Sequence, residues 1–185
     1  TRVYASVSEL LYFNKLVQIP FLVLNKLEKV SFKDLFEHFM NSPNKFKIIN
    51  NINYNFNKHA LQISKGKSEF LYKDGMLDIY WPPGEFEYIS LVLNNKLKDF
   101  YNEIEDHYLS FCTNDFSSKV FIKSLELNQK MMRLPYKSDN VYFEDTYNIY
   151  NSFQSIIKLE NSDFKDIEPI NYKIIKNDLQ FKKID

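Results

Sequence analysis

Glycine and proline are scarce in this chain, with 3 Gly and 6 Pro among 185 residues. Turn-rich sandwiches and barrels need many of both residues, so these folds are disfavoured. Gly66, Gly75 and Gly84 are too scattered to form a glycine-rich phosphate loop, and the sequence contains no G-x-S-x-G nucleophile elbow. The scarcity therefore excludes two common kinds of catalytic site.

Cysteine occurs once, at Cys112, so no disulfide can form within the chain. A reducing compartment is the simplest interpretation, and we expect a cytoplasmic protein. His38, His59 and His107 do not stand in H-x-x-x-H spacing, and no C-x-x-C occurs, so we predict no metal site and no cofactor. Cys112 is interpreted as a small hydrophobic residue, with a nucleophile as the alternative.

Arginine occurs only at Arg2 and Arg133, and the charges balance at 24 Lys+Arg against 24 Asp+Glu. A dedicated nucleic-acid binder is usually basic overall, and bidentate phosphate recognition favours arginine, so both are poorly supported. The apolar stretch at residues 16–24 contains Gln18 and Pro20 and is far shorter than the roughly 20 residues of a membrane span. We expect no membrane partner. Because the chain begins at Thr1 rather than Met, it is open whether it is a fragment of a longer protein.

Hydrophobic residues are plentiful at 44%, and 17% of the chain is aromatic, which is enough for one well-filled core. Helical spacing of apolar residues predicts helices over 4–17, from Pro20 onward, over 31–40 and over 85–111, the last as one continuous helix. A further helix should run to about residue 134, capped by Ser117 or Ser118.

Strand signals are fewer. Residues 52–56 alternate apolar residues with Asn, which fits a strand or a polar loop. Residues 70–80 flank Asp74-Gly75 and predict a hairpin. Residues 141–145 and the stretch from 170 onward alternate like strands, with a short helix over 147–158 between them. The fold class is therefore mainly α with a minor β component (α+β). A helical body over 1–135 carries the hairpin, and residues 136–185 form a small α+β appendage of the same domain.

Charge is unevenly distributed along the chain. Residues 38–68 contain no Asp or Glu but five lysines, whereas residues 139–168 contain seven acids and two lysines. Lysines among aromatic residues can bind a single strand by backbone attraction and base stacking. The alternative is a polar loop that packs its aromatic residues inward, and the two oppositely charged regions could also pair with each other. The candidate binding surface consists of Lys45, Lys47, Tyr54, Phe56, Lys58 and Trp81.

Two further features have simple interpretations. Glu103 and His107 lie four residues apart on a predicted helix, which indicates a solvated ion pair. Trp81 precedes Pro82-Pro83-Gly84-Glu85, so it either anchors a strand-to-helix corner or forms an exposed aromatic platform.

The order of several short motifs resembles a known protein region. They are Phe13-Asn14-Lys15, Ile19-Pro20-Phe21, Trp81-Pro82-Pro83-Gly84-Glu85, Leu127-Asn128-Gln129 and Leu134-Pro135, followed by residues 142–147. Together they resemble the region C-terminal to the catalytic barrel in some cobalamin-binding radical SAM proteins of unassigned role. The family's C-x-x-x-C-x-x-C cluster motif and D-x-H-x-x-G cobalamin motif are absent from this chain. The resemblance thus implies an accessory part that covers a barrel mouth and helps to shape a substrate channel, with no catalytic residue of its own.

Three functional hypotheses follow. The first is a non-catalytic accessory domain that contacts an enzyme core on the same or another chain. The second is a stand-alone module over residues 44–67 that binds a protein or single-stranded nucleic acid, with nucleic acid the less favoured ligand. The third is an enzyme whose site is assembled from scattered polar residues.

Overall fold

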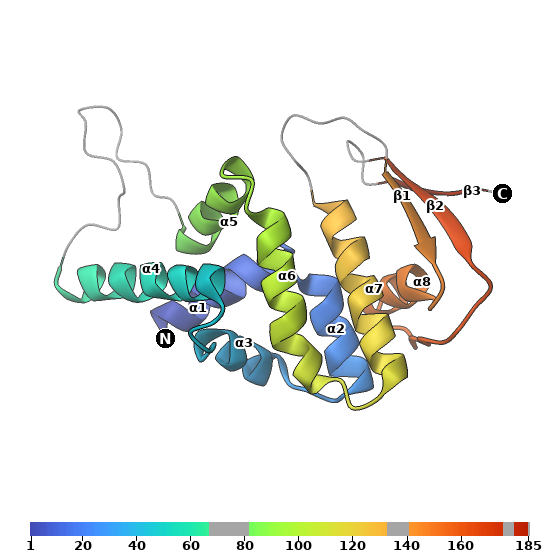
Figure 1. The fold of residues 1–185 in the computed structure, drawn as a ribbon, viewed down its shortest axis with the longest axis horizontal. Helices are drawn as coiled ribbons and strands as arrows, with labels where there is room; N and C mark the ends of the chain where they lie inside the picture. The colour runs from blue at the N-terminus through green and yellow to red at the C-terminus, as the bar shows by residue number, and fades with distance from the viewer. Residues whose placement is uncertain (67–81, 133–140, 176–179, 185) are drawn as a thin grey trace. The chain divides into compact units, whose positions relative to one another are not determined.

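The computed structural model describes residues 1–66, 82–132, 141–175 and 180–184. Within these residues the fold is mainly helical with one small antiparallel sheet, which confirms the predicted fold class (Figure 1). The hairpin predicted near residues 70–80, and Trp81, lie outside the described residues. Contacts divide the chain into two units, one of Thr1–Leu16 with Ser31–His107 and the other of Val17–Val30 with Tyr108–Asp185. The chain passes from one unit to the other between residues 16 and 17, 30 and 31, and 107 and 108.

The first unit is entirely helical in its described residues. Its elements are α1 (Arg2–Ser8), the π-helical turn η1 (Glu9–Phe13), α3 (Phe32–Met40), α4 (Lys47–Ser64), α5 (Pro83–Leu93) and α6 (Leu97–Tyr108). Its core is formed by fully or almost fully buried side chains, among them Leu10, Leu11, Leu35, Phe39, Ile49, Ile52, Phe56, Phe100 and Ile104. In Figure 1, α4 runs beside α1, and its C-terminal half extends past α1, α3 and α5.

The strand or loop expected over residues 52–56 is wrong, because these residues lie inside α4. The buried residues of α4 are Ile49, Ile52, Asn53 and Phe56, which occupy one helical face. Tyr54 belongs to the opposite, exposed face, so its alternation with Ile52 and Phe56 is a coincidence of spacing. Tertiary burial of that face outweighs the poor helix propensity of the repeated asparagines.

The single helix expected over residues 85–111 is also wrong. The chain leaves α5 at Asn94 and enters α6 at Leu97, and Asn95 takes a left-handed conformation with φ of 54°. Asparagine tolerates this conformation better than most residues do, which explains a break at Asn94-Asn95. A 3-10 turn, η2 (Leu109–Phe111), then follows α6.

The second unit combines helices with the sheet. Its elements are α2 (Gln18–Leu27), η2, α7 (Asp115–Met131), β1 (Val141–Asp145), α8 (Ile149–Ile157), β2 (Ile170–Ile175) and β3 (Gln180–Ile184). The strands form an antiparallel sheet in the order β1-β2-β3, with Phe143 opposite Tyr172. The strands predicted at 141–145 and from 170, and the helix between them, are confirmed.

The N-terminus of α7 is set by a residue that the sequence reasoning passed over. The Asn114 side chain caps the helix by accepting the backbone N–H of Ser117 at 2.9 Å. The Ser117 side chain, at the third helical position, accepts the backbone N–H of Asn114, which completes a capping box. The predicted caps Ser117 and Ser118 therefore lie inside the first turn. The Ser31 cap of α3 is confirmed, because Ser31 Oγ accepts the N–H of Asp34 at 3.1 Å.

In the second unit, two more helix starts are capped by side chains of a neighbouring element. The amide oxygen of Asn128 on α7 accepts the N–H of Ile19 in the first turn of α2 at 3.1 Å. The buried carboxylate of Asp145, at the end of β1, accepts the N–H groups of Ile149 and Tyr150 at 2.9 Å each. These acceptors satisfy amides that a helix N-terminus leaves unpaired, and they tie each helix to its neighbour.

In the described ranges, no single helix has the length and apolar character to cross a membrane. Residues Arg2–Phe13 and Gln18–Leu27 reach that length and composition only when the two helical stretches are taken together.

Candidate functional site

Two adjoining hollows lie in the first unit. They are lined by residues of α1, η1, α4 and α5. One has a volume of about 440 Å³ and is lined by Arg2, Ala5, Ser6, Ser8, Glu9, Phe13, His59 and Pro83. The other has a volume of about 320 Å³ and is lined by Asn55, Phe56, Lys58, His59, Gln62, Pro83, Phe86 and Glu87. His59 and Pro83 belong to both hollows. Concave surfaces with converging polar groups are the usual place of binding sites, so this region is the candidate site.

Glu9 stands where η1 meets the start of α5. Its Oε2 accepts the backbone N–H of Gly84 at 2.9 Å, so the carboxylate occupies the positive end of the α5 dipole. Burial raises the pKa of Glu9, and the nearby Glu85 acts in the same direction, whereas the Gly84 hydrogen bond opposes them. The net result is a raised pKa in a carboxyl group that holds two elements together.

Gly84 is required by this close approach. A Cβ at position 84 would come within 2.7 Å of Glu9 Oε2 and within 2.8 Å of both the backbone N of Leu10 and the backbone O of Ser6. Two of these three atoms belong to the backbone, which cannot move aside cheaply. The motif Pro82-Pro83-Gly84 thus starts α5 and also lets it contact η1.

Glu87 on α5 is the second perturbed carboxyl group in the region. It is buried, and its Oε1 accepts a hydrogen bond from the Asn55 side chain of α4 at 2.8 Å. Burial raises the pKa of Glu87, and the Asn55 bond only partly offsets this. Perturbed carboxyl groups beside a hollow are typical of functional sites and also of structural polar ties. Here both Glu9 and Glu87 are engaged in bonds that fix α5.

The structure separates the residues of the predicted binding surface. Lys47, Tyr54 and Lys58 are exposed on α4, and Tyr54 retains 64% exposure. Phe56, in contrast, is only 2% exposed and belongs to the core, so its place on that surface is wrong. Phe46 is likewise buried. Two of the three aromatic residues of this basic stretch therefore face inward, as the alternative interpretation predicted, but Tyr54 and Phe56 lie in a helix rather than in a polar loop.

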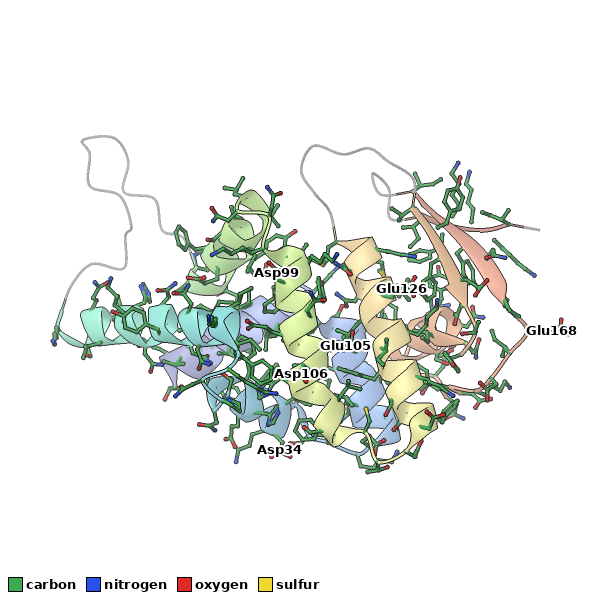
Figure 2. The ribbon with its side chains drawn as sticks, in the orientation of Figure 1. Asp34, Asp99, Glu105, Asp106, Glu126 and Glu168 are labelled. Carbon is green, nitrogen blue, oxygen red and sulfur yellow. The ribbon has the colours of Figure 1, made fainter. Side chains whose placement is uncertain are left out.

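Lys45 is exposed but already paired. Its Nζ lies 2.9 Å from Asp106 Oδ2 and 4.5 Å from the centre of the Phe46 ring. Figure 2 labels Asp106 on α6. Trp81, the last member of the predicted surface, lies outside the described residues.

The exposed face of α4 carries a regular row of side chains, which we name the α4 stripe. It consists of Lys47, Asn51, Tyr54, Lys58, Leu61 and Lys65, all exposed, at successive spacings of four and three residues. In the part of the chain that the structure describes, none of these side chains makes a hydrogen bond or an ion pair. Lys58 also lines the smaller hollow, so the stripe and the candidate site are continuous.

The solvated ion pair predicted between Glu103 and His107 is wrong. Both oxygens of Glu103 accept the N–H of Ile48 at 3.0 Å, and Oε2 also accepts the N–H of Ile49 at 3.0 Å, which caps α4. His107 is buried and stacks on His38 with 3.9 Å between the ring centres. Sequence spacing alone could not reveal either partner, because both lie more than 50 residues away.

Cys112 follows η2 and is half-buried. Burial raises the pKa of its thiol, and the hydrogen bonds with Ser117 and Ser118 only partly oppose this. A raised pKa lowers the thiolate fraction at neutral pH, and the thiolate is the nucleophile. Partial burial and the raised pKa therefore favour the small hydrophobic residue over the nucleophile.

The described ranges hold no group of three or more His, Cys, Asp or Glu side chains placed to bind a metal ion. Compared with known proteins, the chain matches no family model, no curated protein and no solved structure.

Proposed function

We propose that this chain is a non-catalytic accessory domain of a cytoplasmic enzyme, acting by contact with an enzyme core on the same or another chain. The observation that carries the proposal is the set of large apolar side chains exposed around the two hollows. Phe13 lines the larger hollow at 72% exposure, Phe86 lines the smaller one, and Leu61 stands on α4 at 54% exposure. Apolar groups gathered beside polar rims mark surfaces that bind other proteins.

The two perturbed carboxyl groups also support this reading over an enzyme site. Glu9 and Glu87 each accept a hydrogen bond that fixes α5 against its neighbours. An enzyme built from scattered polar residues would need such groups aimed at a substrate. The resemblance of the motif order to the C-terminal region of cobalamin-binding radical SAM proteins suggests the class of core, and no residue of this chain is assigned to its chemistry.

The nucleic-acid alternative has one observation in its favour, which is the acid-free α4 with Lys47, Lys58 and Tyr54 exposed. Stacking platforms use several aromatic side chains along the strand. Because Phe46 and Phe56 are buried, Tyr54 is the remaining aromatic residue of this stretch that could stack.

The test uses the core encoded in the same reading frame or next to it, recognised by C-x-x-x-C-x-x-C. The iron–sulfur-loaded core is assayed for reductive cleavage of S-adenosylmethionine with and without residues 1–185, and the mass of the complex is measured by light scattering. We expect a stable complex and a change in turnover. Phe13→Asp should weaken the complex, whereas Leu159→Asp, at a 95% exposed position in the second unit, should not. If adding the chain changes neither the mass nor the turnover of the core, the proposal is contradicted.

A further inference from the structure

The α4 stripe has the geometry of a seam between two helices. Spacings of four and three residues keep a row of side chains on one narrow face, and the a and d positions of a coiled coil have the same spacing. Tyr54 and Leu61 are seven residues apart in this row, and Lys47, Lys58 and Lys65 lie along it. This one apolar pair fits two apolar residues that are also seven apart on a second helix.

The charge of α4 restricts what that second helix can be. α4 contains no Asp or Glu, and the three lysines of the stripe have no acidic partner in the described residues. An approaching helix with lysines along its seam would meet like charges, whereas carboxylates would be attracted. The complementary surface is therefore acidic.

Within the described residues, the C-terminal half of α4 is the exposed part of the helix. The last buried residue of the helix is Phe56, and residues 57–64 are all exposed or half-exposed. This is more than two turns of helix, about 12 Å long. Short helical stretches are marginal in water unless one face is packed, so a packed partner would stabilise these turns. Figure 1 shows the same end of α4 extending beyond the other helices of its unit.

We infer that the α4 stripe docks an acidic amphipathic helix of a partner protein, with Tyr54 and Leu61 against its apolar residues and the lysines against its carboxylates. The inference rests on the proposed function in that the partner helix belongs to the enzyme core. A protein helix fits better than a single strand of nucleic acid, because Leu61 cannot stack on a base as an aromatic ring does and Tyr54 is the sole exposed ring in the row.

The experiment measures fluorescence anisotropy of a labelled synthetic helix of about four heptads, with leucine at its seam and glutamate beside it, titrated with the whole chain. We expect saturable binding that weakens as salt rises to about 0.5 M. Lys58→Glu with Lys65→Glu should lower the affinity at least about tenfold, as should Leu61→Glu. Lys98→Glu, an exposed lysine on α6, and Leu159→Glu, in the second unit, are the matched controls and should bind as the wild type does.

No binding of the acidic helix, equal binding of a lysine-substituted helix, or tighter binding of an oligothymidine of about 20 nucleotides overturns the inference. Circular dichroism of each variant confirms folding before its affinity is read. The two proposals fail separately. If the complex with the core forms equally well with the stripe variants, the docking role of the α4 stripe is refuted and the accessory role stands. If the peptide binds but no complex with the core forms, the accessory role is refuted and the docking role of the stripe stands.

Discussion

The rings of His38 and His107 stack on each other, and each ring forms a hydrogen bond with the backbone oxygen of the other residue. Nε2 of each imidazole lies 3.0 Å from the backbone oxygen of the other residue, and the ring planes are 15° apart. A carbonyl oxygen only accepts hydrogen bonds, so Nε2 of each ring carries a hydrogen, and a further proton on His107 must add at Nδ1. The pair links α3 to α6 through two reciprocal hydrogen bonds and a ring stack with 3.9 Å between the ring centres.

Acid should therefore destabilise this pair. Burial lowers the pKa of His107, and His38 and Lys45 act in the same direction, while the His38 hydrogen bond and Asp106 oppose them. An unfolded histidine has a pKa of about 6.5, so the unfolded chain binds more protons just below that pH. The stability contributed by neutral His107 is complete above about pH 6.5 and is lost as pH falls toward the lowered folded pKa.

The check is urea unfolding of the wild type and of His107→Gln across about pH 7.5 to 5. Glutamine can still donate to the His38 carbonyl but does not titrate. We expect the free energy of unfolding to fall more steeply with acid in the wild type. Glu9 and Glu87, whose pKa values burial raises, titrate in both proteins, so the difference isolates His107. Parallel curves would show that the histidine pair does not respond to pH.

Glu103 should contribute more to stability than another half-buried carboxylate on the same helix. It caps α4 by accepting two backbone N–H groups, so Glu103→Ala should cost about 1–2 kcal/mol, with Glu103→Gln costing less. Glu105, which is labelled in Figure 2, is the matched control. Glu105→Ala should change the free energy of unfolding by no more than about 0.5 kcal/mol. Equal losses in urea unfolding at Glu103 and Glu105 would contradict the capping role.

The two described glycines should respond differently to alanine. At Gly84 the added Cβ meets two backbone atoms at 2.8 Å, so Gly84→Ala should destabilise the chain by about 1–3 kcal/mol. At Gly66 the Cβ would meet no atom within 4 Å, but φ is +73°, so the cost should be about 1 kcal/mol from backbone conformation alone. A thermal melt in which Gly66→Ala loses more than Gly84→Ala would refute the close contact of α5 with η1.

Local signals explain which elements the sequence could predict. Ser31 before α3 and the alternation of residues 141–145 are read within a few neighbouring residues, and both predictions are confirmed. The strand prediction for residues 52–56 fails because the alternation of Ile52, Tyr54 and Phe56 fits a strand, although these residues lie in α4. Which period applies depends on burial of Ile49 and Phe56 against other elements.

The candidate site was less accessible to sequence reasoning than the fold was. Glu9 is bound to Gly84 and Glu87 to Asn55, at separations of 75 and 32 residues. No local pattern encodes such pairs. One available signal was Gly84 itself, since a glycine inside a helix start indicates a close approach. The sequence shows the lysines of α4. Their spacing of four and three residues indicates a shared face only when residues 47–65 are known to be helical.

The break between α5 and α6 changes which residues of this region belong to the core. A continuous helix would bury Leu97 along its apolar stripe, yet Leu97 is only half-buried at the start of α6, while Phe100 and Ile104 are completely buried. Ile104→Ala should therefore cost about 2–5 kcal/mol, and Leu97→Ala clearly less, because solvent or neighbouring side chains can fill its site. Urea unfolding of both variants under the same conditions gives the comparison. If Leu97→Ala proves as costly as Ile104→Ala, the stripe continues through Asn94-Asn95 and the two helices act as one.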